Sequence, residues 1–154
     1  MIIVRDYRES DASELWKVFY NTVHRINIRD YSEAQVNAWA PDSFSADVWQ
    51  QKMNSISPFI AEVDGQIVGY AALQRSGLID HFFCHNGYQG QGIGLCLMHH
   101  VLSVGQSWEI SRYYSEVSIT ARPFYEKFGF KVVSEQVVEI RGQKLRNFVM
   151  EKFS

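Results

Sequence analysis

The chain has 154 residues, of which 46% are hydrophobic and 14% aromatic, enough for one core of ordinary size and too few residues for two domains. Lys and Arg number 15 against 17 Asp and Glu, so the net charge of -2 leaves no excess of cations for a phosphate backbone, which argues against nucleic acid as a partner. We therefore expect a single domain over residues 1–154.

The sequence offers no sign of a membrane segment or a secretion signal. It has no run of about 18 apolar residues, and its N-terminus lacks a basic region followed by a long apolar stretch. Only two cysteines occur, Cys84 and Cys96, which is sparse for an oxidising compartment. We expect a soluble cytoplasmic protein with reduced thiols and no membrane partner.

The N-terminal third predicts one short strand followed by helices. Residues 1–7 are rich in β-formers, and Asp11 stands three residues before Glu14, which predicts a helix start. Apolar residues then recur at helical spacing to about residue 26. Weaker helical patterns cover 32–40 and 46–54. Three large aromatic residues in this region are expected to line a pocket: Trp39, Phe44 and Trp49.

From residue 59 the pattern changes to strands around one central helix. Strands at 59–63 and 66–73 flank Asp64-Gly65, a strong hairpin signal, and a third strand covers 78–84. A glycine-rich loop then leads into a helix that starts near Ile93. The remaining expected elements are a strand at 113–119, a short helix at 123–128 closed by Gly129, and strands at 130–140 and 145–153 that turn at Arg141-Gly142.

The glycine loop has the character of a phosphate site. Glycines at 87, 90, 92 and 94 allow close backbone approach, and the helix that follows directs free N–H groups and the positive end of its dipole at the loop. A Walker loop is excluded because Gly94 is followed by Leu95-Cys96 rather than Lys-Ser/Thr. A dinucleotide fingerprint fails because its last glycine would fall on Leu95 or Leu97.

What remains is Gln-x-x-Gly-x-Gly at Gln89, Gly92 and Gly94, and it resembles the pyrophosphate signature of the GNAT family, the GCN5-related N-acetyltransferases. The stretch 79–85 before the loop and the stretch 121–130 after it match the same family in order and separation. Two further motifs resemble a YafP-like branch of small bacterial members: Tyr31-Ser32-x-x-Gln35-x-x-Ala38-Trp39 and Arg141-Gly142-x-x-x-x-Asn147-Phe148.

The resemblance covers nearly the whole chain and implies an α/β (α+β) architecture. In this GNAT fold a mixed, mostly antiparallel twisted sheet of about seven strands is flanked by helices in the order β-α-α-β-β-β-α-β-α-β-β. The order of the elements expected above is similar to it. The final strand would lie at an edge of the sheet, where it could pair with a second copy in a homodimer.

The resemblance also implies acetyl-CoA as the acyl donor and no metal. Backbone N–H groups of Gln91 to Gly94 would bind the pyrophosphate, and strand backbone near Phe83 and Cys84 would pair with the pantetheine amides. Two departures from the family leave the placement of the thiol end open: Ser118 stands where Asn is frequent, and Asn86 where Pro is frequent. The residues expected at the cofactor are Phe82, Phe83, Cys84, Gln89, Gly90, Gln91, Gly92, Ile93, Gly94, Ser118 and Tyr125.

Acyl transfer to an amine needs a proton acceptor for the amine and a proton donor for the thiolate. Tyr125 matches the family's general acid, and its phenol is protonated at neutral pH. Asp80 and His81 are alternative bases, either direct or through water, and each could equally be a structural residue. A covalent intermediate on Cys84 is a rival mechanism, disfavoured because this thiol is expected to point away from His81.

The sequence does not identify the acceptor amine. The resemblance places Tyr31 and Trp39 in the wall of its pocket, where aromatic rings favour a small, partly apolar amine or an ammonium. Small-molecule and peptide or protein amines are all compatible. His81-x-x-Cys84-His85 has metal-like spacing, but strand alternation separates its members. The alternative to the enzyme is a non-catalytic acyl-CoA sensor or partner-binding module.

Overall fold

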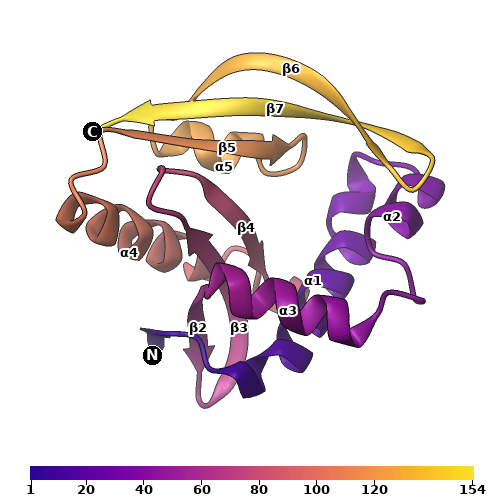
Figure 1. The fold of residues 1–154 in the computed structure, drawn as a ribbon, viewed down its shortest axis with the longest axis horizontal. Helices are drawn as coiled ribbons and strands as arrows, with labels where there is room; N and C mark the ends of the chain where they lie inside the picture. Colours follow the sequence, from indigo (N-terminus) through magenta and orange to yellow (C-terminus); the bar gives the residue numbers. More distant parts are fainter.

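The computed structural model describes all residues, 1–154, and forms two sheets flanked by helices (Figure 1). The helices and strands follow the order expected from the residue patterns, with α2 and α3 as separate helices. Three helices therefore precede β2, where the order implied by the family resemblance has two. They are β1 Ile2–Arg5, α1 Ala12–Arg25, α2 Glu33–Trp39, α3 Ala46–Ile56, β2 Phe59–Val63, β3 Gln66–Leu73, β4 Ile79–Cys84, α4 Ile93–Ser107, β5 Arg112–Ser118, α5 Arg122–Lys127, β6 Lys131–Ile140 and β7 Gln143–Phe153.

The first sheet has four antiparallel strands in the order β1-β2-β3-β4. The β2–β3 turn uses Asp64 and Gly65 with φ of 51° and 80°, as the sequence predicts for a two-residue hairpin. The two faces of this sheet have different partners: Tyr70 and Ile60 pack with α1 and α3, whereas Ala71 and Val68 pack with α4. The strands are therefore buried on both sides, and helices cover both faces.

The second sheet has the order β5-β7-β6, and Figure 1 shows its long β6–β7 hairpin running across the molecule toward α2. The prediction of the last strand as an edge is wrong. β7 pairs with β5 on one side and with β6 on the other, because the hairpin that turns at Arg141-Gly142 returns between them. The free edge belongs to β6, on which Val133 and Val137 are exposed.

The first long helix starts where the sequence predicts, but Asp11 does not act there as the predicted capping residue. Helix α1 begins at Ala12, but the Asp11 carboxylate does not cap it. It accepts two hydrogen bonds at 2.9 Å from the guanidinium of Arg5 and one at 2.7 Å from the backbone N–H of Arg8. The Arg5 side chain also donates to Glu62 at 2.6 Å, and this network fixes β1 to the start of α1. In contrast, Ser32 and Gln35 form the capping box of α2.

Candidate active site

The two sheets are joined by backbone pairing at one point only, near the start of β4 and β5. A single parallel bridge links Leu78 to Tyr114, and one residue further along Ser115 Oγ donates to the carbonyl of Ile79 at 2.8 Å. Beyond that point no backbone pairing joins the two strands, so they separate toward their carboxyl ends. The backbone groups of β4 that face β5 are therefore left without strand partners.

A β-bulge at His81 shapes the edge of β4. Ala71 pairs with Phe82 and Ala72 with Asp80, which leaves His81 unpaired with φ of 59°. The bulge places the side chains of Asp80 and His81 on the same side of the sheet, where Asp80 binds Lys52 of α3 at 3.0 Å. A positive φ is rare for a residue other than glycine and is frequently found at functional sites.

Beyond the bulge, strand pairing decides which backbone groups face the gap. The N–H of His85 donates to Val68 of β3 at 2.7 Å, so the groups of Phe83 turn to β3 and those of Phe82 and Cys84 turn away from it. The Cys84 carbonyl already accepts hydrogen bonds from Thr22 at 2.7 Å and from Gln89 at 3.0 Å. Unused groups remain on the N–H of Cys84 and on the backbone of Phe82.

The glycine loop ends at a helix N-terminus, as predicted. Gly92 is the N-cap of α4 with φ of 87°, and no side chain caps the free N–H groups of the first turn. Gly94 allows α4 and α5 to approach closely, since an added Cβ there would come within 2.9 Å of the Phe124 ring. These N–H groups and the helix dipole favour an anion at this end of β4.

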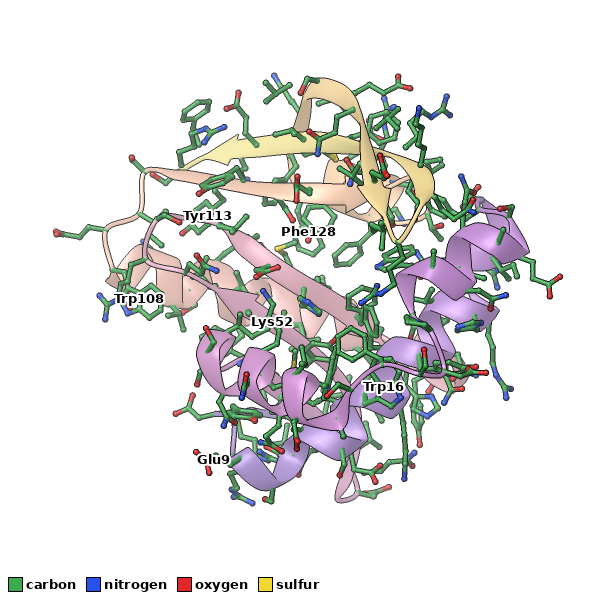
Figure 2. The ribbon with its side chains drawn as sticks, turned by 45° about the vertical axis from the view of Figure 1, so that its right-hand side comes forward. Glu9, Trp16, Lys52, Trp108, Tyr113 and Phe128 are labelled. Atoms are coloured by element: carbon green, nitrogen blue, oxygen red, sulfur yellow. The ribbon has the colours of Figure 1, made fainter.

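One continuous cleft of about 1270 Å³ passes from this loop through the gap between the strands to α1, α2 and α3. Phe128 and Lys52, both labelled in Figure 2, lie on opposite sides of it. Single-ligand sites usually measure about 300–1,000 Å³, so this volume suits two ligands. The cleft includes every predicted cofactor and acceptor residue except Gln91, whose side chain is exposed outside it.

Tyr125 lies on α5 and lines this cleft, with its ring packed against Phe130 and Phe82. Burial raises the pKa of its phenol above the usual value, so the group is neutral and can only give a proton. Its hydroxyl lies 3.4 Å from Ser115 Oγ. Because Ser115 Oγ donates its own proton to Ile79, it can only accept from Tyr125. At 3.4 Å this is a weak hydrogen bond, so it leaves the phenol able to donate to a ligand.

His81 is enclosed by the rings of Phe19, Trp49 and Phe83. Burial lowers its pKa to about 4, so the imidazole is neutral near pH 7. Its Nδ1 lies 3.0 Å from the hydroxyl of Tyr70, and this is the hydrogen bond that the buried phenol makes. The Nδ1 atom is therefore committed to a structural contact.

The two cysteines are free thiols, and Cys84 faces the side of α4 and α5. Burial raises the pKa of its thiol to about 12, so it is protonated and a poor nucleophile near neutral pH. The bulge does not bring Cys84 to His81, since the two side chains pack into different clusters on opposite faces. No group of three or more potential ligand side chains gathers anywhere at metal-binding distances.

Aromatic rings from α1, α2 and α3 form the walls of the cleft where it meets these helices. Trp39 lines it directly, and its ring contacts Tyr31 at 5.6 Å and Phe83 at 6.2 Å between centroids. Tyr31 also lines the cleft, but its hydroxyl is used by the backbone: it donates to Arg146 at 2.6 Å and accepts from Ile119 at 3.0 Å. Only the ring of Tyr31 is free to contact a ligand.

Comparison with known proteins identifies the family to which this architecture belongs. Residues 27–152 match the family described as Acetyltransferase (GNAT) domain. The N-acetyltransferase YafP of Escherichia coli is 30% identical over 149 residues, which cover 97% of this chain and 94% of YafP. The chain belongs to the GNAT acetyltransferase family. As a member of this family it is an acyltransferase, as the resemblance of its glycine loop to the family signature implied.

Solved GNAT structures have the same fold. A GCN5-related N-acetyltransferase from Rhodopseudomonas palustris superposes with a TM-score of 0.94 at 26% identity and covers 99% of this chain and 95% of its own. The PaiA N-acetyltransferase from Thermoplasma acidophilum, solved in complex with coenzyme A, has a TM-score of 0.76 at 19% identity, covering 100% and 99% of the two chains. None of the helices combines the length and the apolar character needed to cross a bilayer.

Sequence reasoning missed four residues that shape this GNAT site. Lys52 forms an ion pair with Asp80, and Thr22 donates a hydrogen bond to the Cys84 carbonyl. Ser115 is hydrogen-bonded to Tyr125, and Tyr70 to His81. The contacts of Lys52 and Thr22 join elements far apart in the chain, whereas those of Ser115 and Tyr70 join consecutive elements. None of the four has a local sequence pattern. Of the four, only Ser115 could have been suspected from the sequence, because a small polar residue in a buried strand needs a hydrogen-bond partner.

Proposed function

We propose that this protein is an N-acetyltransferase that moves an acetyl group directly from acetyl-CoA to a primary amine of a small molecule, peptide or protein. The observation that carries the proposal is the single cleft that joins a phosphate-binding helix end to an aromatic pocket, with the protonated phenol of Tyr125 between them. A binding module would not need a proton donor where the two halves meet.

Acetyl-CoA would bind along the gap between β4 and β5. The first N–H groups of α4, from Gly92 to Gly94, would hold the pyrophosphate, and the free backbone groups of Phe82 and Cys84 would pair with pantetheine amides. Coenzyme A in the PaiA structure supports this assignment at the level of the family. Specificity for the cofactor would then depend on backbone geometry more than on side chains.

The amine would enter from the aromatic end and attack the thioester carbon. We propose Asp80 as the group that takes the amine proton, through water, because its carboxylate is partly exposed to the cleft. His81 is the weaker candidate, since a pKa of about 4 makes its imidazolium costly to form and Tyr70 occupies Nδ1. Tyr125 would donate its proton to the departing thiolate.

The test is release of free thiol from acetyl-CoA across a panel of small amines and peptides, beside calorimetry of acetyl-CoA binding. We expect binding together with thiol release that depends on the amine. Binding without turnover on a broad panel would favour the sensor alternative, and absence of binding would contradict the assignment of the glycine loop.

A further inference from the structure

Two buried side-chain atoms in the molecule lack a hydrogen-bond partner, and both lie in the cleft. They are Oδ1 of Asn147 on β7 and Oγ1 of Thr120, which follows β5 by two residues. Buried polar atoms in folded proteins are nearly always paired, so each unpaired atom requires an explanation. A ligand that pairs with them on binding is such an explanation.

Asn147 belongs to a small polar group in a cleft otherwise rich in aromatic and aliphatic side chains. In the β5–β7 register it stands opposite Ser118. Ser118 Oγ accepts a hydrogen bond from the buried side chain of Asn27 at 3.4 Å and from the N–H of Ala121 at 3.0 Å. Side chains from three distant segments therefore meet here, and the Asn147 oxygen is the member left unsatisfied.

The face of β7 on which Asn147 lies is that of the acceptor. Leu145, two residues earlier, packs in the core cluster of α1, α2 and α3, whereas Phe148 and Met150 pack in the cluster of Tyr125 and α4. Residues two apart in a strand share a face, so Asn147 faces the aromatic end with Leu145. Its position thus favours the amine over the phosphate end of acetyl-CoA.

Hydrogen bonds hold this part of β7 rigidly against α2 and the segment before it. Tyr31 donates to the carbonyl of Arg146 at 2.6 Å, and Gln35 donates to that of Lys144 at 2.8 Å. Arg141 in turn donates to the carbonyl of Ala38 at 2.8 Å. Asn147 directly follows this docked stretch, so its backbone position is fixed before a ligand arrives, as a recognition group requires.

We propose that Asn147 determines acceptor specificity by accepting a hydrogen bond from a second N–H or O–H group of the amine. An amide oxygen can only accept, so the ligand must donate. The substrate class is an amine with a further donor, such as an amino alcohol, a diamine or an amino-acid amide, rather than a plain alkylamine. The inference rests on the proposed acetyl transfer and names the acceptor of the same site.

The test compares matched amine pairs, an amino alcohol with the alkylamine of equal length and a diamine with a monoamine, in the thiol-release assay. We expect the wild-type protein to prefer the member with the extra donor by at least about tenfold in kcat/KM, because a site built for a hydrogen bond rejects an analogue that lacks it. Asn147→Leu should abolish the preference and leave the Kd of acetyl-CoA unchanged.

Two further variants control for folding. Asn147→Asp keeps the size and an accepting oxygen, so it should keep the preference and strengthen it for the diamine, whose second group is a cation. Asn37→Leu makes the same chemical change as Asn147→Leu on the exposed face of α2, outside the cleft, and should leave every constant unchanged.

The remaining outcomes are distinct. Weaker acetyl-CoA binding by Asn147→Leu with an intact amine preference would assign the amide to the cofactor and overturn the inference, as would no change in either. If no amine releases thiol, the proposed function fails, and calorimetry of the same amine pairs with coenzyme A present decides the inference. Binding of the amino alcohol that depends on Asn147 would support it, and binding that is indifferent to Asn147 would overturn it.

Discussion

Tyr125 is the residue on which the proposed chemistry depends most. Its phenol is buried and protonated, and its one side-chain partner, Ser115, is 3.4 Å away. Tyr125→Phe should lower kcat by about a hundredfold or more, since it removes the general acid, while the Kd of acetyl-CoA stays the same. Steady-state kinetics and calorimetry on one preparation measure both.

The matched control for Tyr125→Phe is Tyr113→Phe. Tyr113 is also a buried tyrosine, but its hydroxyl reaches only the carbonyl of Leu102 and does not line the cleft. Loss of the Tyr113 hydroxyl should leave kcat unchanged. A Tyr125→Phe protein that turns over as fast as wild type would remove the acid assignment.

His81 should make folding stability depend on pH. Burial holds its pKa at about 4 in the folded protein against 6.5 as the ordinary value. Between these values the unfolded chain binds more protons, so stability falls as pH falls through this window and is constant above it. Between about pH 7 and about pH 5 the loss is about 2 kcal/mol. Urea unfolding at both pH values measures it.

His81→Gln should remove this part of the pH dependence, because glutamine does not titrate. His99→Gln, at an exposed position on α4, should retain it in full. Equal pH dependence in wild type and His81→Gln would mean that His81 is solvated enough to be charged in the folded state, and the assignment of a neutral imidazole would be incorrect.

The glycine loop is the element for which the sequence makes the most specific prediction. Gly92→Ala places a side chain on a backbone with φ of 87°, and should cost about 1 kcal/mol of stability and weaken acetyl-CoA binding at least about tenfold. Gly142→Ala, at φ of 83° in the β6–β7 turn with no atom near its Cβ, has the same backbone cost and should bind acetyl-CoA normally. Equal Kd values in these two variants, by calorimetry, would contradict the assignment.

Docking of the β6–β7 hairpin depends on Tyr31, whose hydroxyl bridges Arg146 and Ile119. Tyr31→Phe leaves a carbonyl and an N–H unpaired, and should lower the free energy of unfolding by about 1–3 kcal/mol. Tyr114→Phe, which loses only an exposed contact to Ser76 at 3.2 Å, should lower it much less. Urea unfolding of the two variants separates the cases, and equal losses would show that the bridge contributes little.

Local patterns predicted the elements well because the relevant residues are neighbours in the chain. The helical pattern over 32–40 indicated α2, and Asp64-Gly65 indicated the first hairpin. The bulge at His81 and the position of β7 between β5 and β6 could not be read in this way. The bulge arises in the pairing of the consecutive strands β3 and β4, and the position of β7 arises in its pairing with β5 and β6. Strand register of this kind leaves no periodic signal in either strand.

At the scale of the whole molecule, the proposed function depends on the gap between the two sheets. Each sheet is internally paired, and the single bridge from Leu78 to Tyr114 lets them separate along β4 and β5. The family resemblance predicted pairing of the cofactor with strand backbone near Phe83 and Cys84, and this stays a prediction. It did not predict the polar group around Asn147, which exists only once β5, β7 and the segment after α1 have met.

Direct transfer across this gap is tested by one single-turnover measurement. Acetyl-CoA labelled in its acetyl group is mixed with excess protein, with and without the best amine of the panel, and the label is followed by mass spectrometry after rapid quenching. We predict that the label passes to the amine only when both ligands are present and that the protein is never labelled. Labelled protein without amine, above all at Cys84, would contradict direct transfer.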